Sequence, residues 1–398
     1  MSEWTECTLG DVVTLQRGYD LPSRVRRQGC YPVVSSSGTT DWHAEYKVEG
    51  PGVVTGRYGT IGEVFYVAGK YWPLNTTLFV SDFKGNVPRF VYYLLKLFDF
   101  KKFSDKSAVP GVNRNDLYPT KIRLPRDRET QESIALALHS LDDKIEHNNE
   151  LIKMLEEQAQ LVYDYWFMQF DFPDENWRPY RSSGGKMVWS EELKREIPEG
   201  WSVKPCGEVF GVTRGKSYSS EEIEKGSTLM INLKNLAPYG GYNRNMEKPY
   251  SGTFTANHVA KEGDVLMGVT DMTRERRMVG YVLRVPHMEQ ECVFSMDLIK
   301  LLPIAVSPTF LYTSLYYGKY GKKFSPFALG TNVLHLNPTA ISRIPFVVPK
   351  KQVLELADSI FEGIYEKMDA LEAENALLTA QRDFLLPRLM TGEITVAE

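Results

Sequence analysis

The heptapeptide GVTRGKS, residues 211–217, ends in the Gly-Lys-Ser of a phosphate-binding loop. Such a loop needs four residues between its two glycines, so that successive backbone N–H groups can curl around the phosphates. Only three residues separate Gly211 from Gly215, and the position required for the first glycine holds Phe210. The sequence therefore predicts a turn after a short strand at this place, and no nucleotide-hydrolysing site.

Other catalytic patterns are also incomplete. Asp174, Glu192 and Lys194 imitate the two acids and the lysine of a metal-dependent nuclease, but they lie in a stretch rich in Pro, Gly and Ser rather than on adjacent strands. The chain lacks the Asn/Asp-Pro-Pro-Tyr/Phe motif of an amino-methyltransferase, and PYGGY (238–242) lacks the glycine spacing of a dinucleotide or S-adenosylmethionine site. The six histidines and four cysteines have no metal-ligand spacing. We therefore expect no catalytic residue, metal ion or cofactor in this chain.

The chain is an internal repeat. A shift of 197 residues superimposes Trp4 on Trp201, Val12 on Val209 and the pair Arg17-Gly18 on Arg214-Gly215. With a few gaps, IGEVFYV (61–67) matches VGYVLRV (279–285), and PRFVYYLL (88–95) matches PTFLYTSL (308–315). Because Arg-Gly after a short strand is what repeats, the two halves are expected to share one fold.

Each half combines a globular part with a long helix. Short β-branched and aromatic runs broken by Gly, Pro and Asn predict strand-rich domains over 1–128 and 201–349. Segments 129–167 and 350–398 are rich in Leu, Glu and Lys and predict helices, the second with a C-terminal tail; 168–200 is expected to be a linker. The predicted fold class is α+β: two strand-rich globular domains joined by two long helices, with a pseudo-twofold internal repeat.

The charge follows the same plan. The net charge is +5 for residues 1–128 and +5 for 201–349, whereas 129–200 carries −9 and 350–398 carries −5. Two basic globular domains on acidic helices are typical of modules that bind a polyanion while their scaffold does not. The chain has no signal-like start and no apolar run long enough for a membrane span, so we expect a cytoplasmic protein with no membrane partner.

The two helical segments carry matched seams. In each, apolar residues recur at alternating spacings of four and three, from Ile134 to Trp166 and from Ala357 to Leu389. A strict 3.5-residue period is typical of a coiled coil, and the second helix must return toward the first domain, so the pair is expected to run antiparallel. The alternative is two amphipathic helices that each pack on their own domain.

One asparagine interrupts each seam, Asn148 in the first helix and Asn375 in the second. If these two face each other, seam partners have residue numbers that sum to 523, and the large Trp166 lies opposite the small Ala357. Facing asparagines would fix the alignment, because any other register leaves a buried amide without a partner. Pro387 is expected to end or kink the second helix.

The helical segment IRLPRDRETQESIALALHSLDDKIEHNNELIKMLEEQAQLVYDYWF (122–167) resembles the central region of the DNA-specificity subunits of type I restriction–modification systems. The matching residues are Pro125, Gln131, Ile134, Ala135, Leu141, Asp142, Lys144, Ile145, Asn148, Leu155, Glu156, Ala159, Gln160, Trp166 and Phe167. IPFVVPKKQ (344–352) and RDFLLPRLMTGEI (382–394) resemble the distal region, although Lys350 and Lys351 replace its usual apolar-acidic stretch. The resemblance covers the whole chain in the expected order.

The resemblance implies a division of labour. Each globular unit would be a target-recognition domain that reads one half of a split site in double-stranded DNA, and the helices would space the two domains. They would also dock two adenine-specific methyltransferase subunits, which bind S-adenosylmethionine, while restriction/translocase subunits use ATP and Mg. Because the loops of the two halves differ, the site is expected to be asymmetric. The alternatives are a coiled-coil scaffold with no DNA role and a stand-alone DNA-modifying enzyme.

Base-edge recognition requires polar or aromatic side chains on exposed loops, and lysines suit phosphate contacts. In the first domain the candidates are Ser36, Ser37, Trp42, Arg57, Tyr58, Asn75, Thr76, Lys101, Lys102 and Lys106. In the second domain they are Lys234, Asn235, Thr270, Arg274, Arg276, Arg277, Lys322 and Lys323.

Overall fold

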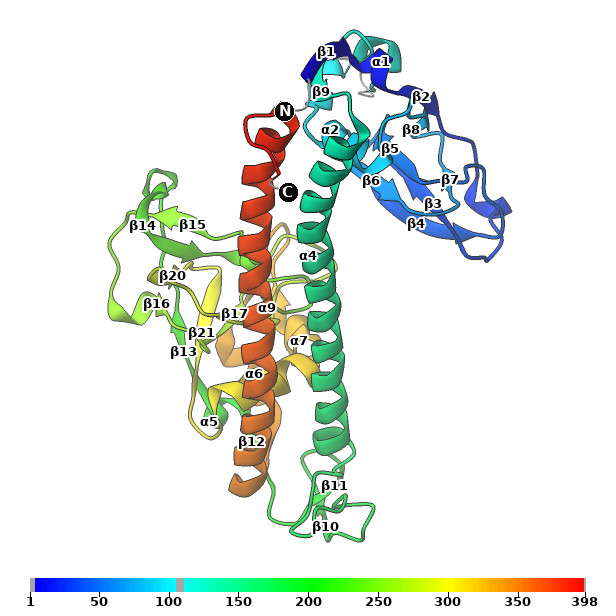
Figure 1. Ribbon diagram of the computed structural model, residues 1–398. Helices are drawn as coiled ribbons and strands as arrows, with labels where there is room; N and C mark the ends of the chain where they lie inside the picture. Colours follow the sequence, from blue (N-terminus) through cyan, green and yellow to red (C-terminus); the bar gives the residue numbers. More distant parts are fainter. Residues whose placement is uncertain (1–3, 105–110, 397–398) are drawn as a thin grey trace. The chain divides into compact units, whose positions relative to one another are not determined.

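The computed structural model describes residues 4–104 and 111–396 (Figure 1). The chain forms two compact units, one of Met1–Asn148 with Glu374–Glu398 and one of Asn149–Ala373. Both long helices, α4 (Arg128–Tyr163) and α9 (Lys351–Thr391), contribute to both units. The boundary between the units therefore falls inside the helices, because each helix packs on the globular domain beside it.

The first unit is built on two sheets. An antiparallel sheet has the strand order β2-β8-β5-β6, and a mixed sheet has the order β4-β3-β7. The strands are β2 (Thr14–Arg17), β3 (Tyr31–Ser35), β4 (Gly38–His43), β5 (Gly52–Gly56), β6 (Val64–Val67), β7 (Trp72–Pro73) and β8 (Thr77–Asp82). The central strand β5, GVVTG, is buried along its whole length, and the amphipathic helix α2 (Pro88–Lys96) packs on β5 and β6. Short β-branched runs therefore do form the strands.

Short elements complete the first unit. β1 (Trp4–Thr8) pairs antiparallel with β9 (Lys121–Pro125). The one-turn helix α1 (Leu9–Val12) follows β1, and the one-turn helix α3 (Arg114–Leu117) precedes β9. Two 3₁₀ turns cover Ser23–Val25 and Phe100–Phe103. The core of the unit lies between the first sheet, α2 and the ends of α4 and α9, and includes Phe90, Leu138 and Leu389.

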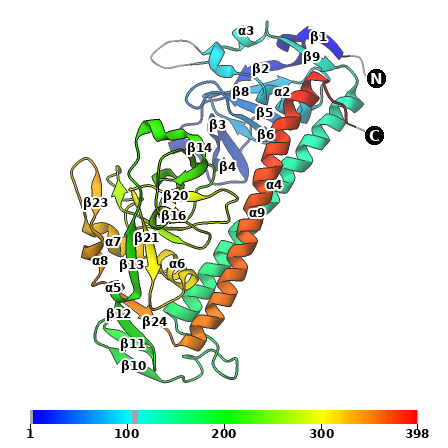
Figure 2. The same cartoon turned by 90° about the vertical axis from the view of Figure 1, so that its left-hand side faces the viewer.

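The second unit repeats this order of elements and has additional sheets (Figure 2). Its sheets have the orders β13-β21-β17-β19, β15-β14-β20-β16, β18-β23-β22 and β12-β24. The strands are β12 (Ser202–Pro205), β13 (Phe210–Arg214), β14 (Ile223–Ile231), β15 (Lys248–Tyr250), β16 (Val259–Ala260), β17 (Val265–Gly268), β18 (Thr270–Asp271), β19 (Val282–Arg284), β20 (Cys292–Phe294), β21 (Leu298–Pro303), β22 (Ala328–Leu329), β23 (Leu334–Leu336) and β24 (Pro345–Val348).

The helices of the second unit occupy the same places in the order. They are α5 (Cys206–Val209), α6 (Pro308–Tyr317), α7 (Tyr320–Phe324) and α8 (Pro338–Ile341), with 3₁₀ turns at Ser220–Glu222, Leu233–Asn235, Ala256–His258 and Ser325–Phe327. Helix α6 contacts strands β17, β19 and β21, as α2 contacts the first sheet. The pairs β1-β9 and β12-β24 correspond in the same way. The repeat in the sequence is therefore a repeat of topology.

The glycine of the repeated Arg-Gly pair has one role in both units. A Cβ atom added to Gly18 would lie 2.1 Å from the carbonyl oxygen of Leu74, and one added to Gly215 would lie 2.0 Å from that of Ser295. At both places a single parallel bridge joins the next residue to the crossing backbone. GVTRGKS therefore ends a strand where two backbones touch, which explains why Gly recurs and the Lys-Ser pair does not.

The two long helices pair antiparallel. In the first unit, Asn148 Nδ2 donates hydrogen bonds to Asn375 Oδ1 at 3.0 Å and to Glu374 Oε2 at 2.7 Å, and the Asn148 side chain is fully buried. The residue numbers of these two asparagines sum to 523, as the predicted register requires. In the second unit the seam residues Ala159, Ala357 and Phe361 are buried in one core. α4 is followed by a π-helical turn over Asp164–Met168, in which Trp166 is buried.

Helix α9 does not end at Pro387, as the sequence suggested, but continues to Thr391. Leu386, Leu389 and Met390 are buried in the core of the first unit. Packing of these side chains outweighs the single backbone hydrogen bond that proline removes close to the helix end. Of the two outcomes predicted for Pro387, an end of the helix is therefore wrong, and a kink stays a prediction.

Each domain is fixed to the helices by buried or half-buried polar contacts. In the first unit, Asp142 of α4 accepts a hydrogen bond from Tyr93 of α2 at 2.6 Å and one from Arg382 of α9 at 2.9 Å. In the second unit, Ser307 at the start of α6 donates to Asp358 of α9 at 2.6 Å, and the hydroxyls of Thr313 and Tyr365 lie 2.8 Å apart.

Charge pairs add a second attachment in the second unit. Asp369 of α9 pairs with Arg244 at 3.2 Å and Arg284 at 2.6 Å, and Glu372 also pairs with Arg244. Part of the excess of basic residues in the second domain therefore neutralises its own helix.

The segment 168–200 is an ordered part of the second unit. It contains the hairpin β10 (Met187–Ser190) and β11 (Arg195–Pro198), and Phe170 and Phe172 pack with Trp201 in the core. Asp174 caps its own turn by accepting hydrogen bonds from the Asn176 and Arg178 backbone amides. Within residues 4–104 and 111–396, no helix is both long and apolar enough to cross a membrane.

Candidate nucleic-acid interface

Three loops of the first unit meet at one end of its sheets. The backbone amides of Arg57 and Tyr58 both donate to the carbonyl oxygen of Thr76, at 2.8 and 3.1 Å. A Cβ atom added to Gly59 would lie 3.1 Å from Ser36 Oγ, so the β3–β4 turn touches the loop after β5. The structure therefore brings Ser36, Arg57, Tyr58 and Thr76 together; we call residues 36–37, 57–60 and 75–76 the first loop cluster.

Within the first loop cluster, the Arg57 guanidinium lies over the ring of Tyr58, 4.5 Å from its centre, and both side chains are half-buried. The Tyr58 backbone forms an antiparallel bridge with Gly111, and Val112 N donates to the Arg57 carbonyl oxygen at 3.0 Å. An arginine that is stacked on an aromatic ring is restricted in rotation but keeps its N–H donors, which suits planar recognition of a base edge or a phosphate.

The remaining polar residues of the first loop cluster differ in availability. Ser37 is exposed, and its Oγ lies 3.0 Å from Ser35 Oγ. The Asn75 side chain donates a hydrogen bond to the Asp20 carboxylate. The hydroxyl of Thr76 is buried and has no hydrogen-bond partner among the described residues. Ser37 is therefore exposed, whereas the half-buried Asn75 is engaged with Asp20.

The other candidates of the first domain lie outside the first loop cluster. Trp42 lies on strand β4 and is 54% exposed. Lys101 and Lys102 lie in the 3₁₀ turn Phe100–Phe103, both exposed, and Lys102 pairs with Asp99 at 3.5 Å. Lys106 lies outside the described residues.

In the second unit a buried carboxylate organises the loop of residues 271–279. Asp271 is fully buried and accepts hydrogen bonds from the backbone amides of Thr273, Met278 and Val279 at 2.6–3.2 Å, and from the Thr273 hydroxyl at 2.7 Å. Burial alone would raise the pKa of Asp271, but these hydrogen bonds outweigh it, and the pKa is lowered. The loop therefore folds around an ionised aspartate.

The arginines of this loop are not equivalent. Arg274 is exposed and forms no ion pair within the described part of the chain. Arg277 is exposed and pairs with Glu275 at 3.2 Å. Arg276 is half-buried, and its Nη1 donates to the carbonyl oxygen of Ser325 at 3.0 Å. Arg274 and Arg277 therefore extend from the loop, whereas Arg276 attaches the loop to the segment after α7.

Two candidates of the second domain are buried and engaged, which contradicts their assignment as exposed base readers. Asn235 is completely buried; its side chain donates to the Asn243 carbonyl oxygen and accepts from the Asn232 amide. Thr270 is 8% exposed and donates to Asp297 at 2.9 Å. Polar side chains in turns often satisfy nearby backbone groups, and these two do so. Lys234, the residue before Asn235, is exposed.

The lysines of α7 do not act as a pair. Lys322 lines a cavity together with Tyr239 and Tyr281. Lys323 lies over the ring of Tyr320, 4.0 Å from its centre, and lines a second, smaller cavity with Arg195. Adjacent residues of one helical turn point in different directions, so the two lysines serve different surfaces.

The residues that hold the loops in place could not be recognised from the sequence as part of the site. Asp20 and Asp271 carry acidic side chains, which are not expected to contact DNA. An Asp shortly before a Thr is nevertheless typical of a side chain that caps a loop. No group of three or more His, Cys, Asp or Glu side chains that could hold a metal ion occurs in residues 4–104 and 111–396.

The sequence is similar to those of known proteins. Residues 1–157 match the family model described as the type I restriction modification DNA specificity domain. The chain is 24% identical to the type I restriction enzyme MjaIX specificity subunit of Methanocaldococcus jannaschii, over 84% of this chain and 76% of that protein. It is 23% identical to the HindI specificity subunit of Haemophilus influenzae, over 99% of this chain and 100% of that protein.

A solved structure has the same fold. The crystal structure of the type I restriction–modification S subunit from M. genitalium matches with a TM-score of 0.64 and 18% identity, over 98% of this chain and 96% of that one. The repeated strand-rich domains and the paired helices agree with these similarities: residues 1–157 match the type I restriction modification DNA specificity domain, and the whole chain is similar to specificity subunits of type I restriction enzymes.

Proposed function

We propose that this chain is the non-catalytic, DNA-reading subunit of a cytoplasmic type I complex, and that each of its two domains reads one half of a split, asymmetric site. The observation that carries the proposal is a repeated scaffold with unlike loops. The Arg-Gly crossing, the sheet and the helix packed on it recur in both units. The loop after β5 carries one arginine stacked on a tyrosine, whereas the loop of residues 271–279 carries three arginines folded around Asp271.

The chemistry of these loops suits duplex DNA. Arg57, Arg274 and Arg277 offer N–H donors in the planar arrangement that matches the two acceptors of guanine in the major groove. Ser37, Trp42 and Asn75 supply polar and aromatic surface, and Lys101, Lys102 and Lys234 are exposed and suit phosphates. Asn235 and Thr270 have no place in this proposal, because their side chains are buried.

The helices are proposed to dock two adenine-specific methyltransferase subunits, which restriction/translocase subunits join. Leu136 and Leu161 of α4 are each 69% exposed, and Met154 is 58% exposed. At 3.6 residues per turn these three lie within roughly 20° of one another around α4, away from the buried seam. Leu377 and Phe384 of α9 are also exposed and are one heptad apart. Large apolar side chains at such spacing support contacts with partner helices.

The reactive groups would then come from the partners. S-adenosylmethionine belongs to the methyltransferase subunits and ATP and Mg to the restriction subunits, and this chain contributes target choice.

A binding experiment with the assembled methyltransferase complex tests the proposal. Arg57→Ala and Arg274→Ala should each lower discrimination at one half-site by about 1–3 kcal/mol and leave the other half unchanged. Binding to duplex DNA should weaken with salt, with a slope of about −0.9 per phosphate contact. Arg128→Ala, which removes an exposed arginine paired with Glu132 on α4, is the matched control.

Three results would contradict the proposal. Salt-independent binding, or none, would favour a scaffold without a DNA role. Binding of S-adenosylmethionine by the isolated chain would favour an enzyme. If both arginine variants retain normal discrimination, the loops are not the readers.

A further inference from the structure

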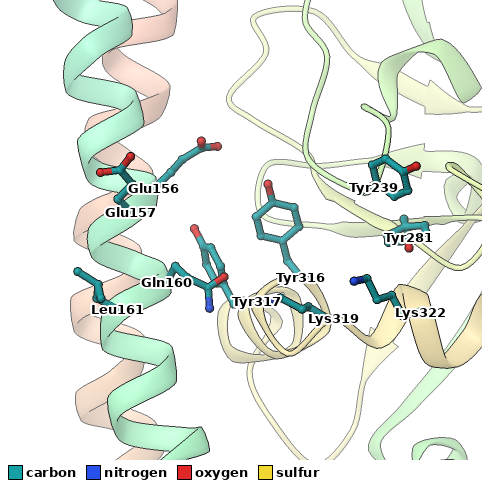
Figure 3. A pocket seen from close by; sticks show the side chains of 10 residues that line it. All are labelled: Glu156, Glu157, Gln160, Leu161, Tyr239, Tyr281, Tyr316, Tyr317, Lys319 and Lys322. Carbon is teal, nitrogen blue, oxygen red and sulfur yellow. The ribbon is translucent and has the colours of Figure 1, made fainter. Parts of the chain in front are cut away.

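A cavity of about 940 Å³ in the second unit lies between α4 and the globular domain (Figure 3). One wall is α4, which contributes Glu156, Glu157 and Gln160. The opposite wall consists of tyrosines and two lysines from the turn of residues 238–242, from the residue before β19 and from the α6–α7 corner. A volume of this order is typical of small-molecule and cofactor sites.

The tyrosine wall is held rigidly. Tyr316 stacks on Tyr312 with ring centres 5.4 Å apart and planes 10° apart, and it meets Tyr317 edge-on at 4.9 Å. Tyr239 and Tyr281 form another edge-to-face pair at 5.6 Å. One face of Tyr316 is occupied by Tyr312, and Figure 3 shows Tyr316 projecting between α4 and Tyr239. Such a wall offers aromatic surface for a flat ring.

Two non-glycine residues of this cavity have left-handed backbone conformations. Tyr239 has φ = 70° and Lys319 has φ = 54°. Tyr239 N donates to the Arg277 carbonyl oxygen at 2.7 Å, and Gly240 lets the turn pack on Tyr316, because a Cβ there would lie 2.8 Å from its ring. Non-glycine residues in this region are costly and gather at ligand-binding sites. The PYGGY turn therefore shapes this cavity.

The polar groups of the cavity are separated by charge. Glu156 and Glu157 lie on the α4 side, and burial, followed by the nearby Glu372, raises the pKa of Glu156. Lys319 and Lys322 lie on the other side, are exposed, and form no ion pair within the described residues. Gln160 Nε2 is buried and has no hydrogen-bond partner among the described residues. A buried amide donor without an acceptor is costly, so it indicates a missing partner.

We propose that this cavity binds a nucleotide unit, with its base against Tyr316, its pairing edge toward Gln160 and Glu156, and its phosphate toward Lys319 and Lys322. Every nucleobase edge carries a hydrogen-bond acceptor beside a donor. The Gln160 amide donates a hydrogen bond to the acceptor of the base, and the Glu156 carboxylate accepts one from its donor. Bases stack on aromatic side chains irrespective of sequence. The ligand is either a free mononucleotide or one unpaired nucleotide of DNA, and the inference does not rest on the proposed reading of duplex DNA.

The experiment measures binding of AMP to the full chain by calorimetry or ligand-observed NMR. Ribose 5-phosphate, which lacks the base, and adenosine, which lacks the phosphate, should each bind about tenfold more weakly than AMP. Gln160→Leu and Tyr316→Ala should weaken binding of AMP and adenosine alike. The double variant Lys319→Ala/Lys322→Ala should weaken AMP and leave adenosine unchanged. Lys367→Ala, an exposed lysine of α9, should change nothing.

A single-stranded pentanucleotide distinguishes the sources. Tighter binding of the pentanucleotide than of AMP identifies an unpaired nucleotide of DNA, and the reverse order identifies a free nucleotide. If Tyr316→Ala does not fold, Gln160→Leu and the lysine variant still decide the matter. The inference is overturned if neither AMP nor the pentanucleotide binds at millimolar concentration, or if binding is unaffected by Gln160→Leu and the lysine variant.

Discussion

Replacement of Asp142 by Ala should loosen the first recognition domain from its helices. Asp142 accepts hydrogen bonds on separate oxygens, from the Tyr93 hydroxyl at 2.6 Å and from Arg382 Nη1 at 2.9 Å. Burial, followed by the hydrogen bond to Asp142, raises the pKa of Tyr93, so its hydroxyl remains a donor. Removing the acceptor leaves a buried hydroxyl unsatisfied, which costs about 1–3 kcal/mol.

Arg382 adds a smaller amount to the expected loss. It retains its pair with Asp383, and its side chain is 21% exposed, so loss of the Asp142 contact costs about 1 kcal/mol. The expected sum for Asp142→Ala is about 2–4 kcal/mol. Asp142→Asn keeps one acceptor oxygen but places an NH₂ group against the other donor, so its loss should be intermediate.

Hydrogen exchange of the α2 amides measures this loss, because α2 carries Tyr93. The free energy of opening of α2 should fall by the stated amount in Asp142→Ala, while amides of the second unit remain unchanged. The matched control is Asp143→Ala, the next residue of α4, which pairs with His139 at the surface and should cost less than about 0.5 kcal/mol. Equal effects of the two variants would refute the anchoring role of Asp142.

Three further predictions concern register, loop order and the strand crossing. A double-mutant cycle between Asn148 and Asn375 should give a coupling of about 1 kcal/mol in the unfolding of the first unit, and zero coupling would show that their hydrogen bond does not stabilise the register. The pKa of Asp271 is lowered in the folded chain, so the ionised side chain stabilises the fold fully at pH values above the ordinary carboxyl pKa. This stabilisation is lost as the pH falls through the lowered pKa. Proteolysis of the loop should therefore increase in acid in the wild type, and an Asp271→Asn variant that is equally protected at pH 7 would contradict this role. Gly215→Ala should destabilise the second unit by about 2–3 kcal/mol in urea unfolding, since the new methyl group meets the Ser295 carbonyl, and an unchanged midpoint would mean that the crossing backbones can separate.

The features that could be predicted from the sequence are those with a regular period or an exact repeat. The 4-3 spacing of apolar residues indicated the paired helices. The two asparagines indicated the alignment, and in the structure they form a hydrogen bond of 3.0 Å. The Arg17-Gly18 and Arg214-Gly215 repeat indicated two copies of one fold. These patterns depend on neighbours along the chain, and local geometry translates them directly into position.

The loops could not be predicted in the same way, because the direction of a polar side chain depends on residues far away in the sequence. Thr270 is buried, and its hydroxyl donates a hydrogen bond to Asp297, which lies 27 residues later in the chain. Asn235 and Asn232 form a cap that a polar NLKNL string does not distinguish from an exposed loop. Likewise, the segment 168–200 resembles a linker in composition, yet Phe170 and Phe172 bury it in the core. Tertiary packing decides each of these cases.

The proposed function requires that this chain select a split, asymmetric DNA site. Mapping of adenine methylation across the host genome, with this gene intact and deleted, tests it most directly. We predict one methylation motif that consists of two different half-sites separated by a non-specific gap. This motif should disappear when the gene is deleted, and Arg57→Ala should relax the specificity of only one half-site. A continuous or palindromic motif, or a methylation pattern that deletion leaves unchanged, would contradict the account.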